Sequence, residues 1–231
     1  MSALSAVIVA AGSGTRMGSA ISKQYLPLGD KPILAHALEA FQRCEAVRAI
    51  VLVVGADDVE RGRCLVLEHR IDKCTAVVAG GADRQQSVHA GLRALDRETE
   101  WVMVHDGVRP FVTVELIERL WAAVRQCEAA VLAVPVKDTV KLVDSAGWIE
   151  ATPDRSRLWA IQTPQAFRLD VLLAAHEAAL RDGFRGTDDA VLVERIGRRV
   201  RIVEGEYTNI KITTPDDLAW GSFWLKGRQK P

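Results

Sequence analysis

Short runs of apolar, mostly β-branched residues alternate along the chain with longer segments whose apolar residues recur at helical spacing. The short runs predict buried strands at residues 6–9, 49–54, 75–78, 101–104 and 129–134. The longer segments predict helices at about 32–43, 57–68 and 113–127. Strands that alternate with helices indicate an α/β fold with a mostly parallel sheet and right-handed crossovers. Ligands of such sheets bind at the carboxyl ends of the strands.

The pattern changes at about residues 136–158, where apolar residues are too few for a central strand. Val140, Leu142 and the turn residues 144–147 predict a β-hairpin. A small hairpin by itself is marginally stable in water. We therefore expect a protruding arm that packs against a second copy of the chain and forms a symmetric homodimer. No linker interrupts the rest of the sequence, so we expect a single domain over residues 1–231.

Helix start signals occur twice after the arm. Thr187 has a suitable residue type for an N-cap, and two acidic residues follow it. Thr214 with Pro215 marks the start of a last helix. The remaining pattern predicts, in order, a strand at 158–161, a turn at 163–165, helices at about 169–181 and 187–196, and a strand at 199–203.

Residues 10–18 follow the first predicted strand and read Ala-Ala-Gly-Ser-Gly-Thr-Arg-Met-Gly. The glycines let the chain turn sharply and bring backbone N–H groups close to a ligand, where such groups bind anions. Arg16 and Lys23 add two positive charges. The loop therefore suits a nucleoside triphosphate, although the glycines alone would fit a tight strand-to-helix turn equally well.

Two common phosphate-binding loops do not fit this segment. The dinucleotide fingerprint G-x-G-x-x-G needs glycine at position 17, which is Met17 here. It also needs an acidic residue about 20 positions further on, and the first acid at a plausible strand end is the more distant Asp57. The Walker pattern G-x-x-x-x-G-K-[ST] is absent. These departures disfavour a nicotinamide-dependent oxidoreductase.

A second glycine loop follows the third predicted strand. Residues 80–87 begin with two glycines, and Asp83 can cap the next helix with Gln86 at its third position. This segment is either only a capped helix or a second ligand loop. We favour the ligand loop, because two glycine loops at strand ends would face one crevice.

The fourth predicted strand ends in the segment His-Asp-Gly-Val-Arg-Pro at 105–110. Asp106 at a strand end beside bound phosphates is a natural Mg²⁺ ligand. Arg109 has the fork of donors that suits phosphate. The alternative is an Asp–Arg pair that only stabilises the loop. We expect His105 to be structural rather than a catalytic base.

The composition excludes several classes of function. The 231 residues are 48% hydrophobic and 26% charged, which is typical of a globular protein. Thirty basic and thirty acidic residues cancel, so we expect neither nucleic acid nor a membrane as a partner, and an anion site must be made locally. No apolar run approaches the roughly 18 residues of a membrane span. The 4 cysteines lack C-x-x-C spacing, so we expect core thiols in a reducing cytoplasm.

Taken in order, these motifs resemble those of the 2-C-methyl-D-erythritol 4-phosphate cytidylyltransferases of the non-mevalonate isoprenoid pathway. The resemblance runs from residue 6 to about 225. It is most specific where the loop with Arg16 and Lys23 occurs together with the segment at 105–110. The other matching segments are Gly80-Gly81 with Arg84 and Ser87, residues 135–141, Thr163-Pro164-Gln165, Thr187-Asp188 and Asn209-Ile210-Lys211.

The resemblance implies a Rossmann-like, glycosyltransferase-A-like nucleotidyltransferase fold. It also implies a reaction that joins CTP to 2-C-methyl-D-erythritol 4-phosphate and gives 4-diphosphocytidyl-2-C-methyl-D-erythritol and pyrophosphate. The nucleophile of that reaction is already an anionic phosphate, which agrees with the lack of a convincing Ser-His-Asp or Cys-His set. Positioning and electrostatics then do most of the work. Mg²⁺ is expected to bridge the phosphates with Asp106 nearby.

The resemblance further implies a role for each matching residue. Arg16 and Lys23 stabilise the transition state, whereas Arg155 and Lys211 position the acceptor phosphate for in-line attack. Thr139 and Arg155 reach the neighbouring subunit's site from the arm. The cytidine and triphosphate are held by Ala10, Ala11, Gly12, Gly14, Gly81, Asp83 and Ser87. The acceptor is held by Asp106, Arg109, Thr139, Thr163 and Thr187.

Several alternatives stay open at this point. A ribitol-5-phosphate cytidylyltransferase would have the same loops and would differ only in its acceptor pocket. A nucleotide-sensing module without catalysis would share the nucleotide loop. Lys211 could be a surface lysine, and Thr187 could be only a helix cap. Arg155 is preferred to Arg157 only because it matches the family's Asp-Arg-x-x-Leu-Trp pattern.

Overall fold

The computed structural model describes residues 3–12 and 22–228. Within them, a seven-stranded sheet has the order β11-β7-β10-β6-β1-β4-β5. Only β10 runs antiparallel to its neighbours β6 and β7, so the predicted α/β fold with a mostly parallel sheet is confirmed. The strands are β1 (Leu4–Ala10), β4 (Val47–Val54), β5 (Cys74–Ala79), β6 (Trp101–Asp106), β7 (Ala129–Pro135), β10 (Trp159–Arg168) and β11 (Arg201–Glu204).

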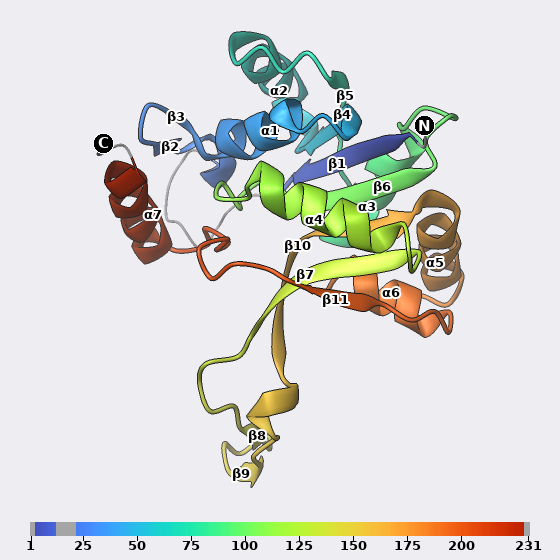
Figure 1. The fold of residues 1–231 in the computed structure, drawn as a ribbon, viewed down its shortest axis with the longest axis vertical. Helices are drawn as coiled ribbons and strands as arrows, with labels where there is room; N and C mark the ends of the chain where they lie inside the picture. The colour runs from blue at the N-terminus through green and yellow to red at the C-terminus, as the bar shows by residue number, and fades with distance from the viewer. Residues whose placement is uncertain (1–2, 13–21, 229–231) are drawn as a thin grey trace.

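Helices cover both faces of this sheet (Figure 1). One face carries α1 (Ile33–Arg43), α2 (Val59–Glu68) and α4 (Val114–Val124), and the other carries α3 (Arg84–Arg93), α5 (Leu169–Arg181) and α6 (Asp189–Arg195). Alternate side chains of a strand enter different cores, with Ile8 of β1 in the first and Val7 in the second. Because both faces are covered, the strands β1, β4 and β7 consist mostly of apolar residues.

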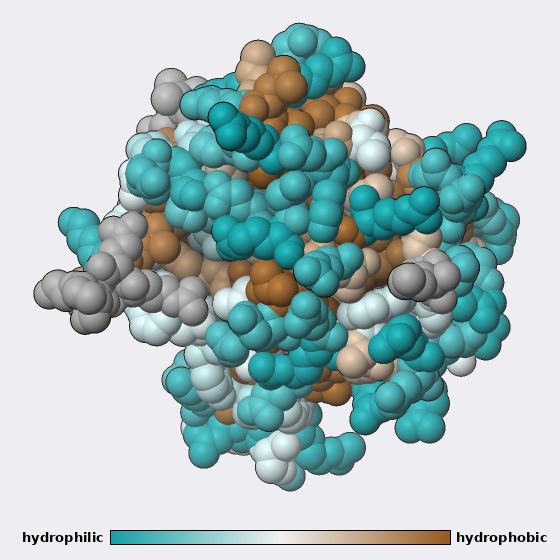
Figure 2. All heavy atoms as spheres, turned by 45° about the horizontal axis from the view of Figure 1, so that its top comes forward, coloured by the Kyte–Doolittle hydropathy of each residue, from teal (hydrophilic) through white to brown (hydrophobic). Residues whose placement is uncertain are grey.

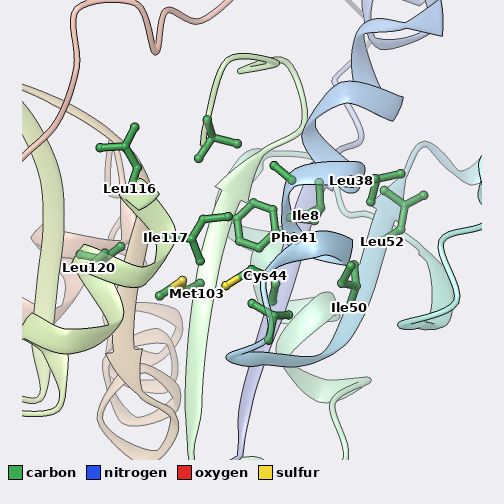
Figure 3. Close-up of a cluster of buried hydrophobic side chains, with 14 of the residues drawn as sticks. Ile8, Leu38, Phe41, Cys44, Ile50, Leu52, Met103, Leu116, Ile117 and Leu120 are labelled. Atoms are coloured by element: carbon green, nitrogen blue, oxygen red, sulfur yellow. The ribbon is translucent and has the colours of Figure 1, made fainter. Parts of the chain in front are cut away.

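The core between α1, α4 and the sheet supports the edge where the strands end. Phe41 of α1, Met103 of β6 and Ile117 of α4 belong to one cluster and are fully buried (Figure 3). Burying a side chain of this size contributes about 1.5–3 kcal/mol. The cluster therefore fixes β6, which ends at Asp106, against its neighbours.

A smaller apolar cluster joins the beginning and the end of the chain. The short hairpin of β2 (Pro27–Leu28) and β3 (Lys31–Pro32) packs through Leu28 with Ile212 and with Leu225 of α7 (Pro215–Arg228). The predicted start of α7 is confirmed. The Asp217 backbone N–H donates to the Thr214 hydroxyl oxygen at 3.2 Å, and the Thr214 N–H donates to the Asp217 carboxylate at 2.8 Å.

The predicted hairpin is also present and projects away from the sheet (Figure 1). It consists of β8 (Leu142–Val143) and β9 (Ile149–Ala151), which pair antiparallel, and a short 3-10 turn at Arg155–Arg157 precedes β10. Trp148 at its tip is 75% exposed, and Ile149 is 63% exposed. An apolar tip in water fits the expected contact with a second subunit, which stays a prediction.

Two local predictions are wrong. Residues 163–165 lie within β10 rather than in a turn, and a cis Thr163–Pro164 bond accompanies a register shift that keeps the strand in the sheet. The N-cap of α6 is Asp188, whose carboxylate accepts the Val191 N–H at 3.0 Å, and not Thr187. Either residue type can cap a helix, so sequence alone does not separate adjacent candidates.

The face of the molecule in Figure 2 is mostly hydrophilic, with apolar patches between the charged side chains. Among residues 3–12 and 22–228, no helix combines the length and apolarity that a membrane crossing requires. The expectation of core thiols holds for Cys44, which is buried. It is wrong for Cys64, which lies on the outer side of α2 and is exposed.

Candidate active site

The first pocket lies at the carboxyl ends of the parallel strands, where the fold predicts a ligand. It has a volume of about 410 Å³. Its lining comes from the end of β1, the 3-10 turn at Lys23–Tyr25, the β5–α3 loop, the end of β6 and the segment that precedes α7. The predicted site residues among the lining are Ala10, Ala11, Gly12, Lys23, Gly81, Asp83, Ser87, Asp106 and Lys211.

The two described glycine segments approach each other at this pocket. A Cβ atom on Gly80 would lie 2.5 Å from the Cβ of Ala11 and 2.6 Å from the Ser87 Oγ. Such distances are shorter than van der Waals contact allows, so only glycine permits this approach. The two segments therefore form one continuous wall of the pocket, as predicted for two glycine loops that face one crevice.

The predicted cap of α3 is confirmed and makes the β5–α3 loop rigid. The Asp83 carboxylate accepts the Gln86 N–H at 2.8 Å. The Ser87 hydroxyl oxygen accepts the Gly81 N–H at 3.1 Å, and the hydroxyl donates to the Asp83 carbonyl at 2.8 Å. Asp83 and Ser87 thus hold the backbone of the pocket wall in place.

A second pocket of about 280 Å³ adjoins the first. It is lined by Arg109, Thr163 and Thr187, which were all predicted to hold an acceptor. Arg84, Asp106 and Lys211 line both pockets. Two ligands bound in these pockets would therefore meet at one cluster of charged side chains.

Asp106 is the centre of that cluster. Its Oδ1 accepts the Arg84 Nε–H at 3.0 Å, its Oδ2 lies 2.8 Å from the Lys211 Nζ, and the Arg109 Nε is 3.9 Å away. Burial would raise the pKa of Asp106, but Arg84, Lys211 and Arg109 lower it well below its usual range. Asp106 is therefore ionised at neutral pH, and the cationic side chains around it outnumber it. This excess of positive charge suits phosphorylated ligands.

Thr163 and His105 fix the loop that carries Asp106 and Arg109. The Asp106 N–H donates to the Thr163 hydroxyl oxygen at 3.0 Å. That hydroxyl lies 3.1 Å from the His105 Nδ1, and the His105 Nε2 lies 3.2 Å from the Arg109 carbonyl oxygen. A neutral ring with its proton on Nε2 satisfies every contact. Burial lowers the pKa of His105 to about 4, so its expected structural role agrees with this geometry.

The arm residues lie elsewhere. Arg155 donates from Nη1 to the Lys137 carbonyl oxygen at 2.7 Å, and both Arg155 and Thr139 are exposed. Neither residue lines either of the two pockets. This position agrees with the expectation that they serve a neighbouring subunit and does not test it. The predicted residues Gly14 and Arg16 lie outside the described residues.

A metal held by the protein alone does not fit this site. Among the described residues, no group of three or more His, Cys, Asp or Glu side chains could hold a metal ion. Both Asp106 oxygens already pair with cations. Mg²⁺ commonly binds through one or two carboxylates together with substrate phosphates, so any ion here would depend on phosphate oxygens.

Sequence reasoning missed three buried or half-buried members of the site. Arg84 was only a matching motif residue, Asp189 was only a helix-start acid, and Asn209 had no role. Asn209 is fully buried, and its Nδ2 donates to the Thr163 backbone carbonyl oxygen at 2.9 Å. The Asn209 backbone carbonyl oxygen accepts the Arg109 Nη1–H at 2.8 Å. The only signal in the sequence was that Asn209 and Arg84 lie within motifs that carry other site residues.

Comparisons with known proteins agree with this geometry. The sequence profile of the 2-C-methyl-D-erythritol 4-phosphate cytidylyltransferase (IspD) family matches residues 4–227. The protein of that name from Geobacter metallireducens is 52% identical over 228 residues, covering 97% of this chain and 98% of its own. The protein of the same name from Geobacillus kaustophilus is 49% identical over 223 residues, covering 96% of this chain and 97% of its own.

The crystal structure of 4-diphosphocytidyl-2C-methyl-D-erythritol synthase from Anaerococcus prevotii superposes with a TM-score of 0.87 at 36% identity. The superposition covers 97% of this chain and 96% of that one. The match therefore extends over the sheet, both pockets and the arm. This chain belongs to the 2-C-methyl-D-erythritol 4-phosphate cytidylyltransferase family.

Proposed function

We propose that this protein transfers a cytidylyl group from CTP to 2-C-methyl-D-erythritol 4-phosphate, releasing pyrophosphate and 4-diphosphocytidyl-2-C-methyl-D-erythritol. Two adjoining pockets that share Arg84, Asp106 and Lys211 are the observation that supports this proposal most directly. A transferase needs two ligands in contact, whereas a nucleotide sensor needs one. The family of the chain supplies the identity of both ligands.

In this proposal the larger pocket holds CTP. Lys23, together with Arg16, stabilises the charge that grows on the attacked α-phosphate and on the leaving pyrophosphate. The base and the phosphates of CTP contact the wall formed by the two glycine segments. The nucleotide-binding residues are Ala10, Ala11, Gly12, Gly14, Gly81, Asp83 and Ser87.

The smaller pocket then holds the acceptor. Asp106 is ionised and suits the hydroxyl groups of the erythritol chain as a hydrogen-bond acceptor. Arg109 and Lys211 bind or orient the acceptor phosphate, which is the nucleophile. Thr163 and Thr187 line the same pocket. Because the Thr163 hydroxyl already contacts His105 and the Asp106 N–H, it offers the acceptor at most a lone pair.

Neither His105 nor Asp106 has the position and protonation state of a general base. His105 is fully buried behind Asp106, and Asp106 is paired with cations. The attacking phosphate is anionic at neutral pH and needs no proton removed. The protein's contribution is then to bring two anions together and to orient them in line.

Mg²⁺ is part of the proposal as an ion that arrives with CTP. When bound, it neutralises phosphate charge and orients the triphosphate. Asp106 lines both pockets and could contribute an oxygen to the ion. It would have to release Lys211 or Arg84 to do so. The protein's own cations do the rest of the charge neutralisation.

We also propose a homodimer in which Thr139 and Arg155 of each arm complete the partner's acceptor pocket. The exposed apolar tip at Leu142, Trp148 and Ile149 supports such a contact, because isolated apolar side chains of this size favour burial. A cytoplasmic location fits a chain whose described cysteines are all free thiols.

One assay tests the central proposal. The purified protein is mixed with radiolabelled CTP, Mg²⁺ and either 2-C-methyl-D-erythritol 4-phosphate or ribitol 5-phosphate, and labelled products are separated by chromatography. We expect a labelled diphosphocytidyl product with the first acceptor. Turnover of ribitol 5-phosphate without turnover of the methylerythritol phosphate would reverse the choice of acceptor. Nucleotide binding without transfer to either acceptor would favour a sensor.

A further inference from the structure

Asp189 is a buried carboxylate to which the proposed reaction gives no role. It is the first residue of α6, and its side chain is 1% exposed. Its Oδ2 accepts the Arg84 Nη1–H at 2.8 Å, and its Oδ1 lies 3.2 Å from the His176 Nε2. Burial would raise the pKa of Asp189, but Arg84 and His176 lower it, so the carboxylate is ionised.

The same arginine contacts Asp106 on its other side. Arg84 uses Nε for Asp106 and Nη1 for Asp189, so two carboxylates from different parts of the sheet edge hold one guanidinium plane. A planar group held at two points has little freedom to rotate. Arg84 lines both the nucleotide pocket and the acceptor pocket. Its third nitrogen, Nη2, is buried without a hydrogen-bond partner in the described part of the chain.

The helix does not need the Asp189 side chain for its own start. Asp188 caps α6 through the Val191 N–H. The Gln165 side chain accepts the Asp189 N–H at 3.2 Å and the Ala190 N–H at 3.1 Å. The side chains of Asp188 and Gln165 therefore accept the backbone N–H groups of the first turn. The Asp189 carboxylate is left to act on Arg84 and His176.

We propose that Asp189 is a positioning residue for the transfer reaction, because its ion pair with Arg84 holds the guanidinium in the wall between the two pockets and so fixes Asp106. This inference rests on the proposed function. Without the Asp189 charge, Arg84 keeps one of its two carboxylate partners among residues 3–12 and 22–228, namely Asp106, and can turn toward the anionic ligands. The shared cluster then gains one unit of net positive charge while it loses its geometry.

That combination predicts a particular kinetic pattern. Added positive charge favours the binding of anions, so KM for either ligand should not rise. Lost orientation lowers the rate of the chemical step, because small displacements from the in-line arrangement are costly. For Asp189→Asn we expect kcat to fall by about tenfold to a hundredfold. KM for CTP and for the acceptor should stay within about threefold of the parent values or decrease.

The test uses the full-length protein and five variants. Asp189→Asn, Arg84→Met and the double variant form a cycle, and kcat and KM are measured together with thermal unfolding. If Asp189 acts through Arg84, adding Asp189→Asn to Arg84→Met should change kcat by less than about twofold. The matched control is Asp182→Asn, which removes the ion pair between Asp182 at the end of α5 and Arg195 of α6, and neither residue lines either pocket. It should leave kcat and KM unchanged.

Arg84→Lys tests the inference even if Asp189→Asn fails to fold. A single ammonium cannot span both carboxylates as a guanidinium does, so kcat should fall by about tenfold or more with KM preserved. Parental kcat in Arg84→Lys or in folded Asp189→Asn would overturn the inference while the proposed function stands. A full-sized effect of Asp189→Asn in the Arg84→Met background would also overturn it. A parent protein that transfers no cytidylyl group would overturn both.

Discussion

The Nζ of Lys211 lies 2.8 Å from the Oδ2 of Asp106, and both side chains line each of the two pockets. The two residues are more than a hundred positions apart in the sequence, and the segment before α7 brings Lys211 back to the end of β6. Before ligands bind, the carboxylate and the ammonium neutralise each other. In the proposed reaction, Lys211 then exchanges Asp106 for a phosphate oxygen when the acceptor enters.

The first prediction concerns Lys211. Lys211→Met keeps the apolar stem and removes the charge at the meeting point of the two pockets. Loss of a preorganised charge donor of this kind should lower kcat by about a hundredfold or more. Lys141→Met is the control, because the Lys141 Nζ donates to the Thr152 hydroxyl oxygen on the exposed arm at 2.6 Å and Lys141 lines neither pocket. Equal activity of Lys211→Met and the control in a steady-state transfer assay would contradict the role of Lys211.

Lys23 gives a second prediction at the other end of the nucleotide pocket. Lys23→Ala should lower kcat by at least about a hundredfold, because the proposed role of the lysine is to stabilise charge that develops only in the transition state. Affinity for CTP, measured by calorimetry without the acceptor, should change much less. A variant that binds CTP weakly but turns over normally at saturation would show that Lys23 serves ground-state binding instead.

The sequence predicted most of the strands and the edge of the sheet at which the pockets lie. Strands covered on both faces must be apolar throughout, so the run that contains Val7 and Ile8 was recognisable. Their carboxyl ends then had to share an edge. Asp189 could not be predicted as a site residue, because an acid in the first turn of a helix is ordinary. Its contact with Arg84 depends on how the start of α6 lies relative to the start of α3, which α5 sets by packing against both helices.

The local errors have a common physical origin. Thr163 was expected in a turn because proline follows it, but the pairing of Gln165 with Val104 of β6 and Val131 of β7 keeps the segment within β10. Thr187 and Asp188 both have N-cap side chains, and the Gln165 contact with Asp188 at 2.8 Å favours the second. In both places a tertiary contact decides between local conformations that the sequence allows equally.

A third prediction tests the proposed homodimer and the proposed contribution of each arm to the partner's site. Arg155→Ala and Lys23→Ala should each be inactive, and a mixture of the two should recover part of the activity. One hybrid site in each mixed dimer would combine an intact Lys23 with an intact Arg155 from the partner's arm. Subunit exchange is verified first with two differently tagged parent chains. No recovery in spite of exchange would mean that each arm serves its own subunit.

The last prediction follows from the buried, neutral His105. Burial lowers its pKa from 6.5 to about 4 in the folded protein, so between these values the unfolded chain binds more protons at this position. Unfolding is then favoured as the pH falls from 6.5 toward 4. At pH 5 the contribution of His105 to the free energy of unfolding should be about 2 kcal/mol smaller than at pH 7.5.

The measurement compares urea unfolding of the parent protein and of His105→Gln at both pH values. Gln cannot titrate, so the variant should be less stable than the parent at pH 7.5, and the gap should shrink by about 2 kcal/mol at pH 5. His36 and His89 also have lowered pKa values through burial, and they contribute equally to both proteins. An identical loss of stability on acidification in parent and variant would mean that His105 keeps an ordinary pKa and that the Thr163–His105 contact does not hold the 105–109 loop as described.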